Sequence, residues 1–140
     1  MKFWDSSALV PLLVNEADTL RRAEVLKADA ALAVWWGTAV ECESALQRRV
    51  REGALDATGA RQARERLAVL AAAWHEVPAT AAVRTLAVRL LRTHPLRAAD
   101  SLQLAAALVL AQAGLAELTF LSADMRLADA AEIEGLAVVR

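Results

Sequence analysis

The most apolar stretch of the chain runs from Leu96 to Gly114 and has no polar face for most of its length. A helix that is apolar on all sides is normally buried, so this pattern predicts a helix packed inside the protein. One carboxylate, Asp100, lies near its start and shares a helical face with Leu104 and Ala107. An acid in a first turn complements the helix dipole, but it can also hold a metal ion if other acids converge on it.

Short apolar segments alternate with helical patterns along the rest of the chain. Strands are predicted at 2–7, 31–36, 76–77, 118–121 and 136–139, and helices at about 17–28, 39–51, 57–74, 80–93, 96–114 and 125–134. Short buried strands separated by longer helices are typical of a parallel sheet with helices on both faces. The sequence therefore predicts one α/β domain, residues 1–140, with a parallel sheet of four to five short strands.

The helix patterns also predict which side chains point inward. In the helix at 17–28, the helical period places Leu20 on the inner face and leaves Arg22 in water. Thr38 and Glu41 fit the capping box, in which a threonine N-cap and a glutamate three residues later satisfy backbone groups at the helix start. Glu41 thus has a structural explanation available.

Composition restricts the kinds of site that the chain can carry. With one cysteine and two histidines, an internal disulfide is impossible and a Cys/His zinc site is not expected, so any metal would be held by oxygen. The apolar runs fall short of the roughly 18 residues needed to span a bilayer, and no basic-then-apolar leader opens the chain. We therefore expect a cytoplasmic protein that does not enter membranes.

The charge balance does not by itself identify a nucleic-acid-binding protein, because the formal net charge is −1. However, fourteen arginines accompany two lysines, and arginine suits bidentate contacts with phosphate. The same arginines also fit solvated outer faces of helices, so both interpretations remain open at this point.

Four acids fall at the same edge of the predicted sheet. Asp5 closes the first strand, Glu41 opens the helix after the second, Asp100 opens the buried helix, and Asp124 follows the strand at 118–121. Each acid also has a purely structural explanation. Asp5 can form a turn, Glu41 can belong to the capping box, Asp100 can complement the helix dipole, and Asp124 can be an N-cap. Together, however, crowded carboxylates repel one another unless a cation neutralises them, and an all-oxygen set suits Mg²⁺ or Mn²⁺. Such an ion can activate water for phosphodiester hydrolysis.

Four segments resemble the motifs of the PIN-domain ribonucleases, and most closely those of the VapC-type toxins of type II toxin-antitoxin systems. These segments are FWDSSALVPLL, VECESAL, LRAADSLQLAAAL, and FLSADMRLADAA with the downstream EGLAV. The resemblance covers nearly the whole chain, from Lys2 to Val139. It implies a PIN-like three-layer sandwich and a metal-dependent endoribonuclease, a hydrolase that cuts RNA phosphodiester bonds.

The same resemblance implies the site residues and the partners. The implied catalytic acids are Asp5, Glu41, Asp100 and Asp124, of which Asp5, Asp100 and Asp124 would hold Mg²⁺ or Mn²⁺. An active toxin would be neutralised by a cognate antitoxin in a hetero-oligomer, and we also expect a homodimer. The apolar pieces at 10–14 and 67–74 are candidates for these two surfaces, although they can instead complete the core.

Four further residues are candidates for secondary roles. Glu43 competes with Glu41, but the two point about 200° apart on a helix, and first-turn placement favours Glu41. Ser122 is expected to orient water or a ligand. Arg97 and Arg126 lie beside site acids in sequence, where they either hold the RNA backbone or pair with those acids.

Other kinds of protein share part of this pattern. Haloacid-dehalogenase phosphatases and response-regulator receivers also place an Asp after the first strand, but both need a lysine late in the chain, and none follows Lys27. A catalytically inactive PIN-like module that only docks RNA or a protein partner remains the alternative. The presence of all four acids argues against it.

Overall fold

The computed structural model describes residues 1–114 and 117–140 as one parallel sheet covered by helices. The strands are β1 (Lys2–Trp4), β2 (Leu32–Trp35), β3 (His75–Val77), β4 (Thr119–Leu121) and β5 (Ala137–Val139). They lie in the order β3-β2-β1-β4-β5, and every pairing is parallel. The prediction of an α/β fold with a short-stranded parallel sheet is confirmed.

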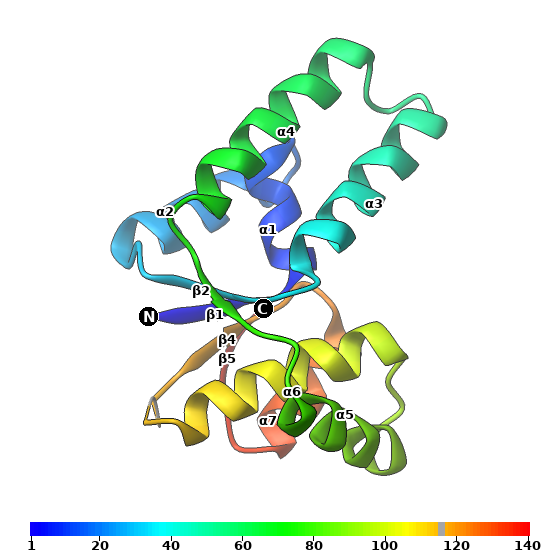
Figure 1. The fold of residues 1–140 in the computed structure, drawn as a ribbon. Helices are drawn as coiled ribbons and strands as arrows, with labels where there is room; N and C mark the ends of the chain where they lie inside the picture. The colour runs from blue at the N-terminus through cyan, green and yellow to red at the C-terminus, as the bar shows by residue number, and fades with distance from the viewer. Residues whose placement is uncertain (115–116) are drawn as a thin grey trace.

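The helices form two layers on opposite faces of the sheet (Figure 1). The upper layer in that view holds α1 (Ser6–Leu13), α2 (Thr19–Ala28), α3 (Thr38–Arg51) and α4 (Ala57–Ala71). The lower layer holds α5 (Ala81–Thr93), α6 (Ala98–Gln112) and α7 (Met125–Ile133). The protein is therefore a three-layer sandwich, and none of the helices in the described ranges is both long and apolar enough to cross a membrane.

Alternation along the strands divides the core between the two faces. On β1, Phe3 belongs to the apolar cluster under α5 to α7, whereas its neighbour Trp4 belongs to the cluster under α1 to α4. On β4, Phe120 and Leu121 divide in the same way. Successive side chains of a strand point to opposite faces, so these very short strands supply both cores.

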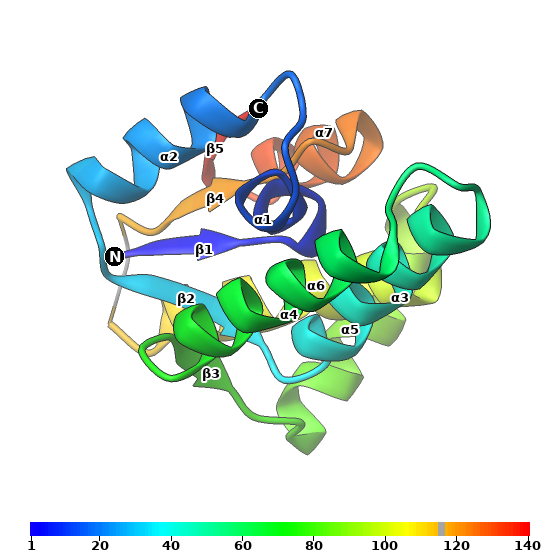
Figure 2. The same ribbon diagram turned by 90° about the horizontal axis from the view of Figure 1, so that it is seen from above.

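Helix α6 is the buried helix that the sequence predicts. Leu104 and the three alanines that follow it are fully buried against the lower face of the sheet. Seen from above, α6 passes beneath β2 (Figure 2). Its first turn therefore lies near the carboxyl ends of the central strands.

The first strand ends earlier than predicted, at Trp4 instead of Ser7. Asp5 takes an extended conformation as the N-cap of α1, and its side chain accepts a hydrogen bond from the backbone N–H of Ser7 at 3.3 Å. This cap starts a helix immediately after the strand.

The predicted orientations of Leu20 and Arg22 in α2 are wrong. Leu20 is 82% exposed, whereas Arg22 is only 1% exposed and donates from Nε to Oδ2 of Asp18 at 2.7 Å. Because the carboxylate of Asp18, one turn earlier, pairs with it, the guanidinium of Arg22 can be buried. The face of α2 that turns inward therefore carries Arg22 instead of Leu20.

Candidate active site

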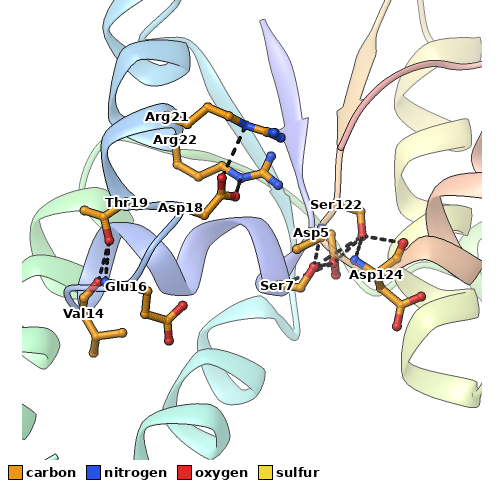
Figure 3. Close-up of polar contacts among 11 residues, drawn as sticks. Asp5, Ser7, Val14, Glu16, Asp18, Thr19, Arg21, Arg22, Ser122 and Asp124 are labelled. Carbon is orange, nitrogen blue, oxygen red and sulfur yellow. Dashed lines mark hydrogen bonds and ion pairs between the residues drawn. The ribbon is translucent and has the colours of Figure 1, made fainter.

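The centre of the sheet is the point at which strand order reverses. From β1 the chain moves first to β2 and later to β4 on the other side, and Trp4 pairs in register with Leu121. In open α/β sheets, ligands bind at such a switch point, outside the carboxyl ends of the strands. Asp5 follows β1 there, and the loop with Ser122 and Asp124 follows β4 beside it (Figure 3).

Asp5 is buried and held by hydroxyl groups. It is 3% exposed, and its Oδ2 accepts hydrogen bonds from the Oγ of Ser7 and, at 3.0 Å, from the Oγ of Ser122. The two serines also join the loops, because Ser7 Oγ accepts from the backbone N–H of Ala123 at 2.9 Å and Ser122 Oγ accepts from that of Asp124 at 3.0 Å. The contacts of Ser122 orient Asp5 and Asp124, and its role in orienting water or a ligand stays a prediction.

Glu41 lies in the first turn of α3, at the same edge of the sheet as Asp5. Its Oε2 accepts from Ser6 Oγ at 3.0 Å and its Oε1 from Gln103 Nε2 at 3.2 Å. The predicted capping box is wrong, because Gly37 is the N-cap and makes no side-chain cap, while the hydroxyl of Thr38 accepts from Gln103 at 3.2 Å. Capping therefore does not explain Glu41.

Glu43 lies away from the other acids. Its Oε1 accepts from Gln47 at 2.7 Å and from Arg64 at 3.1 Å on the outer side of α3. The geometry thus separates the two competing glutamates in the way that the helical angle predicts, with Glu41 toward the other acids and Glu43 toward a surface arginine.

The remaining two acids begin helices at the same edge. Asp100 lies in the first turn of α6. Asp124 is the N-cap of α7, and its Oδ1 accepts a hydrogen bond from the backbone N–H of Leu127 at 2.9 Å. The N-cap alternative for Asp124 is therefore observed. Capping occupies one carboxylate oxygen, which leaves the other oxygen available to a ligand.

The four acids interact electrostatically. Burial raises the pKa of Asp5, with a further rise from Asp100, although hydrogen bonds from Ser7 and Ser122 oppose it. Burial raises the pKa of Glu41, and the charges of Asp5 and Asp100 raise it further. The hydrogen bonds from Ser6 and Gln103 to its carboxylate lower this pKa and oppose the rise.

Asp100 responds in the same way. Burial and then the charge of Asp124 raise its pKa, and the backbone and guanidinium of Arg97 oppose the rise. Among residues 1–114 and 117–140, none of the four acids forms an ion pair with a basic side chain. A bound cation would relieve this repulsion.

Three of the acids, Glu41, Asp100 and Asp124, line a cleft with a volume of about 1040 Å³, and Asp5 is buried behind Ser6 and Ser7, which line it too. Arg97 and Arg126 line it too, as does Arg48 from α3, which the sequence did not single out. Within the described ranges, neither Arg97 nor Arg126 forms an ion pair with a site acid, although the charge of Arg97 lowers the pKa of Asp100. The cleft thus combines a carboxylate centre with guanidinium groups.

The donor set fits a hard divalent cation, because the acids and the neighbouring serines offer oxygen and neither histidine lines the cleft. In the part of the chain that the structure describes, no three Asp, Glu, His or Cys side chains are already close enough to hold one ion together. Mg²⁺ commonly keeps several waters and binds through one or two carboxylates. The assignment of three acids to one ion remains a prediction.

Sequence reasoning missed the residues that support the acids, namely Ser6, Ser7, Thr38 and Gln103. One signal was present in the sequence. Gln103 is a polar residue inside an apolar helix, and it lies three positions after Asp100, so the two share a helical face.

The fold has known counterparts, although no protein-family model and no curated protein sequence matches the chain. The structure of PAE2754 from Pyrobaculum aerophilum matches with a TM-score of 0.65 and 19% identity, over 99% of this chain and 88% of that one. The structure of FitAcB from Neisseria gonorrhoeae matches with a TM-score of 0.67 and 17% identity, over 100% of this chain and 97% of that one. At these identities the matches show the fold alone, and this chain has the α/β architecture of PIN-like domains.

Proposed function

We propose that this protein is a metal-dependent endoribonuclease that acts as a VapC-type toxin. The observation that carries the proposal is the acidic cluster at the switch point. The pKa values of Asp5, Glu41 and Asp100 are raised above their ordinary values, and none of the three forms an ion pair with a basic side chain in the described structure. A bound cation would offset the repulsion between these carboxylates, and acids with raised pKa values in a cleft are typical of functional sites.

Each acid has a role in this proposal. Asp5, Asp100 and Asp124 hold Mg²⁺ or Mn²⁺, which when bound supplies positive charge for the phosphate and makes water a better nucleophile. Glu41 accepts a proton from the attacking water and orients it, while Ser6 and Gln103 fix its carboxylate. The two serines that donate to Oδ2 of Asp5 hold that carboxylate in one orientation.

Incubation of the purified chain with RNA tests the function directly. We expect cleavage with Mg²⁺ or Mn²⁺ and none with EDTA. Cleavage that persists in EDTA would contradict the metal-dependent mechanism. RNA binding without cleavage under any metal would instead support the catalytically inactive docking module.

Arginines at the cleft should hold the RNA backbone. Replacing Arg97 or Arg126 with Ala should lower the slope of log binding constant against log salt by about 0.7 each, because each phosphate contact to a single strand releases counterions. Fluorescence anisotropy with a labelled RNA across a salt series measures this slope. Arg84→Ala, on the exposed side of α5, is the matched control, and a slope unchanged in Arg97→Ala and Arg126→Ala would remove both from the RNA surface.

The proposal includes a cognate antitoxin that binds an apolar groove. The segment at 10–14 was expected to supply exposed apolar surface, but Val10, Leu13 and Val14 are buried in the core, so that expectation is wrong for them. The groove that is present, about 640 Å³, lies between α1, α2 and α4 and is lined by apolar side chains from each, namely Leu12, Ala23, Leu26, Val69 and Leu70.

A charge in this groove should prevent antitoxin binding. Val69 is 73% exposed within it, so Val69→Glu should leave the fold intact but abolish co-purification with the protein of the neighbouring reading frame. Val88→Glu, on the opposite helical layer, is the control and should still co-purify. Equal co-purification of both variants would place the partner elsewhere, and a wild-type chain that is harmless alone would contradict the toxin assignment.

We also infer a homodimer, which light scattering of the purified chain tests.

A further inference from the structure

Gln103 is a polar side chain in the most apolar part of the molecule. It is 0% exposed on α6, directly before the buried run of Leu104 and the alanines that follow. Its Nε2 donates to Thr38 Oγ1 and to Glu41 Oε1, each at 3.2 Å. Its own Oε1 accepts no hydrogen bond from any residue in the described ranges. The amide therefore uses its donor side and leaves its acceptor side unpaired.

Such an amide is an unfavourable choice for packing alone. A buried polar group without a partner loses its hydration and gains nothing in exchange, and two hydrogen bonds from the donor side offset this only in part. A leucine or methionine has similar volume and would satisfy the core of α6. The fold does not require a glutamine here, so the reason for it lies with the groups that it contacts.

Those contacts fix a carboxylate that would otherwise be free to rotate. Glu41 is held from two directions, at Oε1 by Gln103 of α6 and at Oε2 by Ser6 of α1. A glutamate side chain has several rotatable bonds, and donors on both oxygens select one orientation. Because the amide is neutral, it does this without cancelling the negative charge, as an arginine in its place would.

We propose that Gln103 is a positioning residue that sets the orientation of Glu41 toward the acidic centre. The proposal rests on the ribonuclease function proposed above. Gln103 is not a catalytic residue, because it contacts Glu41 and Thr38 and does not line the cleft. Its effect on the reaction passes through Glu41.

Gln103→Leu tests the proposal through three measurements, of which only kcat should change strongly. The unfolding midpoint in EDTA should stay close to that of the wild type, because the unpaired Oε1 is removed from the core while Thr38 and Glu41 each lose a donor. The RNA dissociation constant should be unchanged, whereas kcat should fall about 10- to 100-fold, since a displaced catalytic group costs this much. Gln112→Leu, the same substitution at the exposed end of α6, should leave all three quantities unchanged.

A double-mutant cycle separates positioning from a general structural effect. If Gln103 acts through Glu41, then Gln103→Leu should not lower kcat further in a Glu41→Gln background. Additive losses, an unchanged kcat in the single variant, or an unfolding midpoint clearly below that of the wild type would each overturn the inference. Failure of the wild-type chain to cleave RNA would instead overturn the proposed function, and with it the role of Gln103, so the two failures are distinguishable.

Discussion

Asp100→Asn should abolish metal-dependent RNA cleavage and, in EDTA, make the protein more stable than the wild type. The acids at the switch point repel one another, and burial together with the charge of Asp124 raises the pKa of Asp100. A neutral isostere removes that repulsion together with a metal ligand. Loss of several kcal/mol of charge stabilisation, for example about 4, corresponds to roughly a thousandfold in rate.

The order of stabilities should reverse when metal is added. The wild type should gain about 2.7 kcal/mol at a free metal concentration 100 times its dissociation constant, whereas Asp100→Asn should gain little. For a domain of this size, each 1 kcal/mol shifts the unfolding midpoint by about 2–8 °C. Thermal unfolding of both proteins in EDTA and in excess Mg²⁺ measures all four values. A variant less stable than the wild type in EDTA would contradict the repulsive cluster.

The pH dependence of this difference follows from the sign of the pKa shift. Because the pKa of Asp100 is raised in the folded state, the folded protein binds the proton more tightly than the unfolded chain. Its contribution to stability is therefore most favourable below the ordinary Asp pKa and is lost as pH rises through the raised value. The gain from Asp100→Asn in EDTA should accordingly be full at neutral pH and shrink on acidification.

The fold was predictable because it depends on local patterns. Strands of alternating or continuous apolar residues, separated by helices, specify a parallel sheet, and the chain order then places Asp5 and Asp124 at one edge. The failures came from local side-chain hydrogen bonds. Arg22 is buried because Asp18 pairs with it, and the start of α1 depends on a side-chain cap by Asp5. Neither interaction is visible in hydrophobic periodicity.

The supporting residues of the site were less accessible for a different reason. Ser6 reaches Glu41 across 35 positions of sequence, Gln103 reaches it across 62, and Ser7 meets the backbone of Ala123 across 116. A sequence read in order gives the edge of the sheet on which a residue lies but not which neighbours its hydroxyl or amide will find. The acids could be chosen by topology, whereas their hydrogen-bond partners required the structure.

Glu41→Gln should reduce kcat by about 10²- to 10⁴-fold, the usual contribution of a general base, whereas Glu43→Gln should leave it nearly unchanged. The two positions are a matched pair, since both glutamates lie on α3 and both changes replace a carboxylate with its isosteric amide. Only Glu41 faces the other acids, and the charges of Asp5 and Asp100 help to raise its pKa. Glu43 accepts from Gln47 and Arg64 at the surface, where an ion pair contributes about 0–1 kcal/mol to stability.

The fold should tolerate both changes, which makes the comparison interpretable. In Glu41→Gln, the new amide can still accept from Ser6, and the Gln103 amide can turn so that its unpaired Oε1 accepts from the new NH₂ group. Circular dichroism and unfolding midpoints should therefore be close to those of the wild type for both variants. Steady-state cleavage of one labelled RNA at saturating Mg²⁺ gives the kcat values. Equal losses at the two positions would show that Glu41 holds no special role, and the assignment of the proton-accepting residue would then have to be abandoned.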